Sequence, residues 1–231
     1  MKIVRTRALR KTYAAGTVHE VEVLHGVDME VRPGEFVAIV GQSGSGKSTL
    51  LNILGALDVP TSGTVEINGV DVTVLSSDQL ADLRGNTVGF VFQAHYLLDE
   101  FSCLENALMP VTIQKGAPSK DDVRRVTALL ERVGLHDQLR KPPGQMSGGQ
   151  QQRVAVIRAL ANEPRLILAD EPTGNLDSKS GQEVFSLMRE MAHETGVAFI
   201  MVTHDDRLAR EADRILRIED GLIGEVTGEF R

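Results

Sequence analysis

The segment Gly41-Gln-Ser-Gly-Ser-Gly-Lys47-Ser48 has residue types and a spacing that suit the binding of phosphate groups. It fits the pattern G-x-x-x-x-G-K-[ST], and it follows a buried-strand pattern at 31–41 and opens a helical pattern. Glycines let backbone N–H groups approach a phosphate, and the start of a helix favours negative charge. Lys47 would reach the β and γ phosphates of a nucleotide, and Ser48 would offer its hydroxyl to Mg²⁺. The residues expected to bind the nucleotide here are Gly41, Gln42, Ser43, Gly44, Ser45, Gly46, Lys47, Ser48 and Thr49.

Two adjacent carboxylates, Asp170 and Glu171, end the apolar strand pattern at 165–170. Ligands of open α/β sheets bind at the carboxyl ends of the strands, so both side chains are expected beside the nucleotide. Asp170 is expected to hold Mg²⁺, and Glu171 to orient or deprotonate the attacking water. The alternative is a strand followed by an acidic loop without a catalytic role.

Gln93 and His204 follow two other strand patterns, at 88–93 and 197–202. An amide at Gln93 could contact both Mg²⁺ and the attacking water, and His204 could donate a hydrogen bond to the γ-phosphate. Residue type alone leaves open a surface glutamine and a structural histidine. The other histidines match no metal-ligand spacing.

A second helix start with anion-binding character lies at Ser147-Gly148-Gly149, before an apolar face formed by Val154, Ile157 and Ala161. Within one copy, the γ-phosphate cannot easily be reached both by this start and by the loop at 41–48. We therefore expect Ser147 to contact a nucleotide held by another copy, with two copies packed head to tail around two ATP molecules.

Composition restricts the class of protein. The chain has 231 residues, a formal net charge of −7 and one cysteine. The negative charge argues against a broad nucleic-acid-binding face, and a single cysteine excludes an internal disulfide. Cys103 is expected to be a small buried hydrophobe. The apolar run at 197–202 is far shorter than the roughly 20 residues that span a bilayer, and the basic start lacks an apolar block, so we expect a soluble cytoplasmic protein that acts at membranes only through a partner.

The order of the patterns predicts an α/β core that is interrupted by helices. Strands are expected at 31–41, 88–93, 165–170, 197–202 and 214–220, and helices at 47–57, 76–85, 178–194 and 205–211. An alternating stretch at 62–72 with a turn at Asn68-Gly69 predicts a hairpin, so the first third is expected to add a small antiparallel sheet. Between 94 and 162, strand patterns are absent and helices are expected at 104–113, 121–133 and 148–161. Strand–helix alternation elsewhere favours a mostly parallel sheet.

Taken in chain order, the phosphate-binding loop, Gln93, Ser147-Gly-Gly-Gln150, Asp170-Glu171 and His204 resemble the nucleotide-binding domain of ABC transporters. The resemblance covers essentially the whole chain. It implies a P-loop NTPase core of the RecA-like type, a single domain over 1–231 with the helical insertion at about 94–162, and ATP and Mg²⁺ as cofactors.

The resemblance also implies roles for individual residues. Tyr13 matches the aromatic that stacks on adenine, and 174–177 matches the loop that links the two sites of the dimer. Met146 stands where the family usually has leucine, a change of little expected effect. The residues expected to act across the dimer are Ser147, Gly148, Gly149, Gln150 and Asp177; the expected Mg²⁺ ligands are Ser48, Gln93 and Asp170; and the expected catalytic residues are Glu171, His204 and Gln93.

The segments 55–72, 89–110 and 169–178 look like the branch of the family that contains the LolD and MacB ATPases, and His95–Phe101 looks closest to the LolD type. This likeness implies integral permease partners, a location on the cytoplasmic face of the inner membrane and lipoprotein release. MacB-like efflux and a cell-division mechanotransmission complex remain alternatives. A soluble ABC ATPase of DNA repair or translation is disfavoured by the acidic charge and by the lack of a coiled-coil insertion. A regulator that binds ATP without hydrolysis is disfavoured by Asp170, Glu171 and His204.

Overall fold

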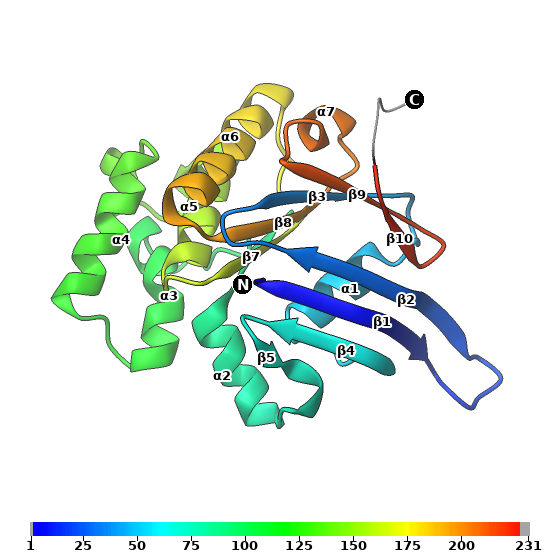
Figure 1. The fold of residues 1–231 in the computed structure, drawn as a ribbon. Coiled ribbons are helices and arrows are strands. Elements are labelled where there is room, and N and C mark those ends of the chain that lie inside the picture. Colours follow the sequence, from blue (N-terminus) through cyan, green and yellow to red (C-terminus); the bar gives the residue numbers. More distant parts are fainter. Residues whose placement is uncertain (1, 227–231) are drawn as a thin grey trace.

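The computed structural model describes residues 2–226; residues 1 and 227–231 of the expected domain lie outside the described part. Two sheets and two groups of helices make up the molecule (Figure 1). The strands are β1 (Val4–Tyr13), β2 (Val21–Val31), β3 (Phe36–Val40), β4 (Ser62–Ile67), β5 (Val70–Asp71), β6 (Val88–Phe92), β7 (Leu166–Asp170), β8 (Ala198–Val202), β9 (Arg214–Glu219) and β10 (Leu222–Glu225). The α-helices are α1 (Lys47–Leu54), α2 (Ser77–Thr87), α3 (Cys103–Lys115), α4 (Lys120–Arg132), α5 (Gly148–Leu160), α6 (Ser178–Thr195) and α7 (Asp206–Ala209).

The central sheet has the strand order β10-β9-β3-β8-β7-β6. The pairs from β9 to β6 are parallel, and only β10 runs antiparallel to its neighbour. Side chains alternate between its faces, as strand geometry requires. In β3, Phe36 and Ala38 pack towards α5 and α6, whereas Val37 and Ile39 pack towards α1 and the second sheet. Both faces are therefore apolar, as in other buried parallel sheets.

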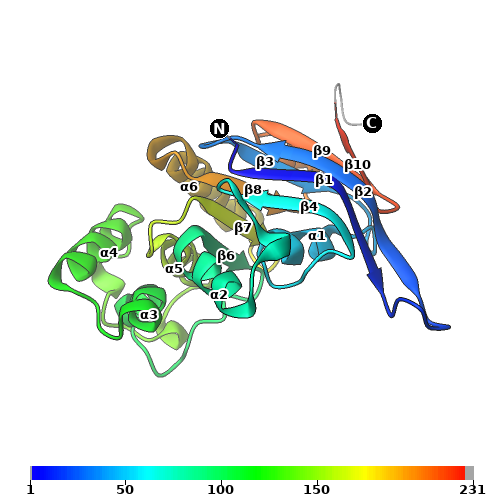
Figure 2. The same cartoon turned by 60° about the horizontal axis from the view of Figure 1, so that its bottom comes forward.

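The second sheet is antiparallel, with the order β2-β1-β4-β5. It lies against the same face of the central sheet as α1, and Leu24, Val27 and Val65 are buried between the two layers. The group formed by α3 and α4 lies at the opposite end of the molecule from β10, as Figures 1 and 2 both show. A short α/β core thus separates a β-rich end from a helical end.

The predicted fold class is confirmed, with differences at some boundaries. The expected helix at 47–57 ends at Leu54. The Gly55 N–H still donates to the Leu51 carbonyl oxygen, but Ala56 has φ 53° and its N–H donates to Ile53, three residues back, so the α-helical bonding stops there. Leu57, which continues the apolar period, is exposed. The helix expected at 205–211 is only one turn long, α7. Strands β1, β2 and β10 were not individually predicted. Cys103 is buried as expected, and burial raises the pKa of its thiol to about 11.

Three phenylalanine rings join the central sheet to α6. The Phe36 and Phe199 rings stack at 5.4 Å between centroids, and the Phe185 ring meets Phe36 edge-on at 5.2 Å. All three side chains are fully buried. Offset-stacked and edge-on arrangements add stabilisation to the burial of area.

Replacing Phe185 with alanine should lower the free energy of unfolding by about 3–5 kcal/mol, because the ring leaves a cavity that the sheet cannot fill. Urea unfolding followed by circular dichroism measures the change. The exposed Val74→Ala serves as control and should change stability by less than about 0.5 kcal/mol. Equal losses in the two variants would contradict this account of the core.

Candidate functional site

Four predicted site segments lie along one edge of the central sheet. Because β3, β8, β7 and β6 are successive neighbours and parallel, their carboxyl ends meet at the same edge. The phosphate-binding loop follows β3, His204 follows β8, Asp170 ends β7 and Gln93 follows β6. Residues more than 160 positions apart in the sequence are thereby brought together along the carboxyl-end edge of the sheet, which is where open α/β sheets bind ligands.

The loop between β3 and α1 depends on glycine at two positions. Gly44 has φ 80° and Gly46 has φ 106°, values that side chains other than hydrogen disfavour. A Cβ at Gly46 would also lie 2.9 Å from Leu24 Cδ2 and 3.1 Å from the Val23 carbonyl oxygen. Gly46 is the N-cap of α1, where no side chain caps the helix and no acidic residue lies in the first turn. The first N–H groups of α1 are thus left for an anion.

The Lys47 ammonium is folded onto the loop. Its Nζ donates to the carbonyl oxygens of Gly41 at 2.8 Å and Gln42 at 2.6 Å. A phosphate held by the loop would offer the same ammonium a charge-assisted bond, which is stronger than these neutral ones. Lys47 therefore sits where the sequence pattern requires, at the mouth of the loop.

A cleft of about 470 Å³ opens beside this loop. Of the predicted nucleotide-binding residues, Gln42 and Ser45 do not line it, and the buried Ser45 hydroxyl has no hydrogen-bond partner within residues 2–226. Tyr13 and Gln93 are also absent from the lining. The lining residues are Val23, Gly41, Ser43, Gly44, Gly46, Lys47, Ser48, Thr49, Asp170, Glu171, Val202 and His204.

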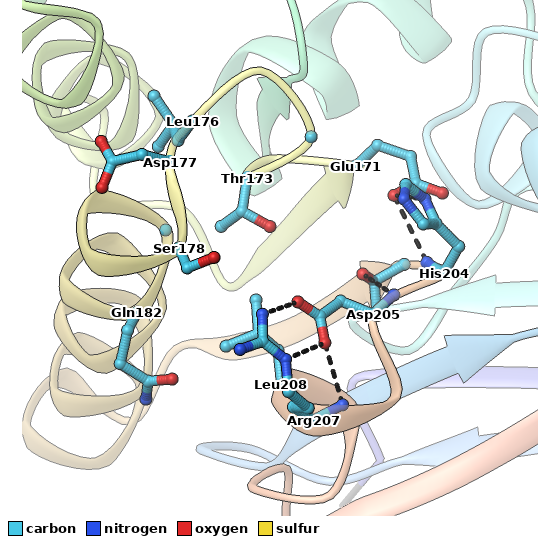
Figure 3. Close-up of a pocket in the computed structure, with 13 residues that line it drawn as sticks. Glu171, Thr173, Leu176, Asp177, Ser178, Gln182, His204, Asp205, Arg207 and Leu208 are labelled. Carbon is cyan, nitrogen blue, oxygen red and sulfur yellow. Dashed lines mark hydrogen bonds and ion pairs between the residues drawn. The ribbon is translucent and has the colours of Figure 1, made fainter.

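The two carboxylates of the cleft differ in environment. Burial raises the pKa of Asp170 above its ordinary value, the neighbouring Glu171 charge raises it further, and the Lys47 ammonium opposes both. Glu171 occupies a left-handed turn with φ 47°, which directs its side chain away from the strand axis. Its Oε2 lies 2.8 Å from Nδ1 of His204, and Figure 3 shows the imidazole folded against the carboxylate. The structure thus pairs the two residues that the sequence placed in separate catalytic roles.

Gln93 is held to the loop at 174–177 by two hydrogen bonds with Asn175, here called the clasp. Its Nε2 donates to Asn175 Oδ1 at 2.9 Å, and Asn175 Nδ2 donates to the Gln93 carbonyl oxygen at 3.1 Å. A Cβ at Gly174 would lie 2.8 Å from Gln93 Nε2, so the clasp also needs glycine at that position. The pairing of Gln93 with Asn175, 82 residues apart, was not predicted, and no local pattern in the sequence indicates it.

The start of α5 lies away from the cleft of its own copy, since none of Ser147, Gly148, Gly149 or Gln150 lines it. Ser147 and Gln150 form a reciprocal capping box that fixes the helix start. Gly148 and Gly149 face Leu176 and Ser180. The expectation that one copy cannot bring both helix starts to one phosphate agrees with this placement.

Asp177 caps α6 by accepting from the N–H groups of Lys179 and Ser180. The Ser180 hydroxyl first, and then these N–H groups, lower the pKa of its carboxyl. It borders a second, smaller cavity of about 150 Å³ that also touches Glu171 and His204 (Figure 3). The loop at 174–177 therefore lies between the catalytic pair and the surface that carries Ser147. Met146, the residue that departs from the family pattern, is buried in the core.

The donor set of the cleft suits Mg²⁺ held together with phosphate. Within residues 2–226, no three or more His, Cys, Asp or Glu side chains form a metal-binding group. Mg²⁺ is usually held by one or two carboxylates together with substrate phosphates rather than by an all-protein cage. Of the three expected ligands, the Asp170 carboxylate and the Ser48 hydroxyl line the cleft and fit that rule, whereas Gln93 does not line it.

Residues 24–174 match the family described as ABC transporter. The chain belongs to this family. It is therefore an ABC ATPase, which binds ATP and couples its hydrolysis to transport. Among curated relatives, it is 52% identical to the lipoprotein-releasing system ATP-binding protein LolD 1 of Rhodopseudomonas palustris, over 96% of this chain and 98% of the relative. It is 50% identical to the macrolide export ATP-binding/permease protein MacB of Nitrosomonas europaea, over 96% of this chain but 33% of that protein.

Solved structures of ABC cassettes confirm the fold. The dimeric post-hydrolysis state of the ATP-binding cassette MJ0796 bound to ADP and Pi is 40% identical, with a TM-score of 0.84, over 98% of this chain and all of that one. CbiO1 from Clostridium perfringens, part of the complex cbiONQ, is 30% identical with a TM-score of 0.86. In the part of this ABC chain that the structure describes, no helix has the length and apolar character needed to cross a bilayer.

Replacing Gly46 with alanine should weaken ATP binding by the ABC chain at least tenfold, because φ 106° and the contact with Leu24 force the phosphate-binding loop to shift. Isothermal calorimetry with ATP measures the loss. Gly85→Ala is the matched control: its Cβ meets nothing within 4 Å, and it lies in α2. This control should keep ATP affinity and gain about 0.5–1 kcal/mol of stability. Unchanged ATP affinity in Gly46→Ala would contradict the assigned geometry.

Proposed function

We propose that this chain is the ATP-hydrolysing subunit of a transporter that releases lipoproteins from the inner membrane, bound on its cytoplasmic face to integral permease subunits. The observation that carries this proposal is full-length similarity: four relatives named lipoprotein-releasing system ATP-binding protein LolD are 49–52% identical over 95–97% of the chain. MacB relatives are of similar identity but are three times longer than the matched region, because they carry a permease in the same polypeptide, as their name states.

Two copies of the chain are proposed to close head to tail around two ATP molecules. The placement of Ser147, Gly148 and Gly149 away from their own cleft supports this, as do the relatives whose solved structures are dimeric. In the closed state each copy presents the start of α5 to the γ-phosphate held by the other, with Gln150 and Asp177 beside it. ATP then makes contacts that the open state lacks, and this difference in affinity is what shifts the equilibrium towards closure.

Within each cleft, Lys47 and the N–H groups of α1 are proposed to hold the phosphates, and Ser48, Asp170 and Gln93 to hold Mg²⁺. The metal would neutralise charge on the β and γ phosphates. Glu171 positions and deprotonates the attacking water, and His204 stabilises the γ-phosphate from the adjacent strand end. The contact between Glu171 and His204 supports a shared role, because it keeps both groups aimed at the same region.

Coupling to the permease is proposed to run through residues 93–110. The first part of this region, the segment 93–101, is held directly by α5. Arg158 donates to the carbonyl oxygens of His95 and Tyr96 at 2.7 and 2.6 Å, and Gln152 contacts His95 and donates to Phe92. A movement of α5 must therefore move this segment too.

The far part of the segment presents apolar side chains outward. The buried Asn106 bonds the backbone at Leu98, Phe101 and Ser102 and so fixes the loop. Tyr96, Leu98 and Phe101 are exposed at 67%, 44% and 37%, whereas Leu97 packs inward against the core. A fixed loop with outward apolar side chains suits a protein–protein contact. Leu97 of this segment therefore packs against the core, and Tyr96, Leu98 and Phe101 are available to a partner.

A MacB-like efflux or mechanotransmission complex is the second candidate, because MacB relatives match over the same residues at almost the same identity. The two candidates share the ATPase chemistry and differ in the permease. A soluble ABC ATPase has no specific support among these relatives.

Lys47→Ala should weaken ATP binding by about 10- to 100-fold, since it removes charge-assisted bonds to phosphate. Glu171→Gln should keep ATP affinity and lower the rate of phosphate release by about 10²–10⁴, the usual share of a general base. Calorimetry and a phosphate-release assay measure the two effects. The exposed Glu190→Gln on α6 is the matched control and should behave as the unmodified chain.

The same Glu171→Gln protein should elute as a dimer with ATP and as a monomer without it on gel filtration. Wild-type phosphate release in Glu171→Gln would contradict the role of Glu171. A chain that stays monomeric at high protein concentration with saturating ATP would contradict the head-to-tail dimer.

Tagged Glu171→Gln protein, purified from solubilised native membranes with ATP, should bring down two different permease subunits and an inner-membrane lipoprotein. Adding Leu98→Asp should abolish this capture while ATP affinity stays unchanged, because a charge replaces an apolar contact. Adding Val74→Asp, at a more exposed position outside the segment 93–101, should not. A single permease with a periplasmic adaptor would replace lipoprotein release by MacB-like efflux. No captured membrane protein would contradict transport.

A further inference from the structure

The ammonium of Lys11 on β1 is an unusual buried charge. Lys11 is 9% exposed, and its Nζ lies 2.6 Å from Asp58 Oδ1 and 2.8 Å from the Val59 carbonyl oxygen. The same Nζ lies 4.8 Å from the centroid of the Tyr13 ring. An ammonium has three N–H donors. Its three neighbours here are a carboxylate, a carbonyl oxygen and the π face of an aromatic ring, which is one partner for each donor. Buried lysines are found almost only when paired in this way.

Asp58 joins this lysine to the tyrosine. Its second oxygen, Oδ2, accepts from the Tyr13 hydroxyl at 3.1 Å. Burial tends to raise the pKa of Asp58, but hydrogen bonds from Lys11, the Val59 N–H and Tyr13 outweigh it, and the pKa falls below its ordinary value. The carboxylate is therefore charged at neutral pH and holds both partners at once. Lys11, Asp58 and Tyr13 form a closed triad, here called the base clamp.

The base clamp is anchored to the helix that begins at the phosphate-binding loop. The N–H groups of Leu57 and Asp58 both donate to the Asn52 carbonyl oxygen in α1. On the other side, Thr61 bonds the backbone of Thr12 in both directions, which ties the segment after Asp58 to the end of β1. The Tyr13 ring is thereby positioned relative to α1 through bonded contacts, although Tyr13 lies at a strand end and is 41% exposed.

We infer that Asp58 and Lys11 are positioning residues that hold the Tyr13 ring as the platform for the adenine base, and that they set the affinity of this chain for the base rather than for the triphosphate. The inference rests on the proposed function as an ATP-hydrolysing subunit, and on the role that the family resemblance implies for Tyr13, which is to stack on adenine. An exposed ring at a strand end would otherwise lose rotational freedom on binding, and a ring fixed beforehand avoids that cost. Lys11 lies against the ring on one side, and the exposed part of the ring is left for the base.

The sequence makes a direct test possible, because the chain has no tryptophan and two tyrosines, Tyr13 and Tyr96. In a Tyr96→Phe background, ultraviolet emission from tyrosine comes from Tyr13 alone. Every variant is compared in this background, by fluorescence titration and by calorimetry. The two probes are ATP, which has a base, and inorganic tripolyphosphate, which has none.

Asp58→Asn and Lys11→Met should each weaken ATP binding about tenfold, within the range that base–aromatic stacking contributes. Tripolyphosphate affinity should stay within about twofold, since the phosphate grip is unaltered. The ATP-induced change in Tyr13 emission should shrink in both variants. Adding Tyr13→Ala to Asp58→Asn should cause no further loss beyond Tyr13→Ala alone, because the two act as one unit.

Three results would overturn the inference, and they are distinguishable. If Tyr13→Ala weakens ATP binding but Asp58→Asn and Lys11→Met do not, the platform stands and the base clamp is wrong. If Tyr13→Ala leaves ATP affinity unchanged, the adenine role that the family resemblance implies for Tyr13 fails as well. An equal loss for ATP and tripolyphosphate in Asp58→Asn would also overturn it, because the effect would then reach the phosphate-binding loop through α1.

Discussion

The parallel register of β3, β8, β7 and β6 is the constraint on which the site depends. Each strand is short and fully or largely buried, and each ends at a residue of the candidate site or one or two residues before it. Register is strongly fixed because both faces are apolar, and a slip of one residue would expose one face of each strand to the wrong layer. The same packing that stabilises the core thus fixes the separation between Gly41, His204, Asp170 and Gln93. No separate device is needed to assemble them.

The polar groups of the site are bonded to different parts of the molecule. Glu171 contacts His204 across neighbouring strand ends, whereas Gln93 is bonded to Asn175 in the loop that precedes α6. Gln93 also continues into the segment that Arg158 and Gln152 of α5 hold. The Glu171–His204 contact therefore belongs to the ends of the sheet strands, and the proposed path to a partner runs through the helices. In the proposed dimer, the sheet holds the nucleotide in one position, while the helices around it are left to change position when the two copies close.

Sequence patterns predicted the chemistry better than the geometry. The phosphate-binding loop and the strand-end carboxylates were found because glycine, lysine and acidic residues there satisfy local backbone and charge requirements. Strand β1 was missed as a separate element because its buried positions, Val4, Thr6, Leu9 and Lys11, mix apolar and polar residues and so give no apolar alternation. Strand β2 does alternate from Val27 to Val31, so this part of the sheet was recognisable from the sequence. Helix α1 was drawn too long because Leu57 continued its period, although Gly55 already ended the helix.

The contacts of Asn175, Asp58 and Lys11 could not have been predicted for a different reason. Each joins residues 47 or 82 positions apart, and neither partner lies in a motif that names the other. Such pairs exist only once the sheets are packed, so their information is in the fold rather than in any window of sequence. They are also where a charged or amide group replaces an apolar contact at the border between layers. Lys11 is buried and is bonded to Asp58 and Val59, whereas Gln93 and Asn175 are exposed and bond each other; each pair holds two distant segments in one relative position. The phosphate-binding loop lies within one layer of the molecule. The proposed adenine platform and the proposed link to the second copy each join two layers, so both depend on pairs of this kind.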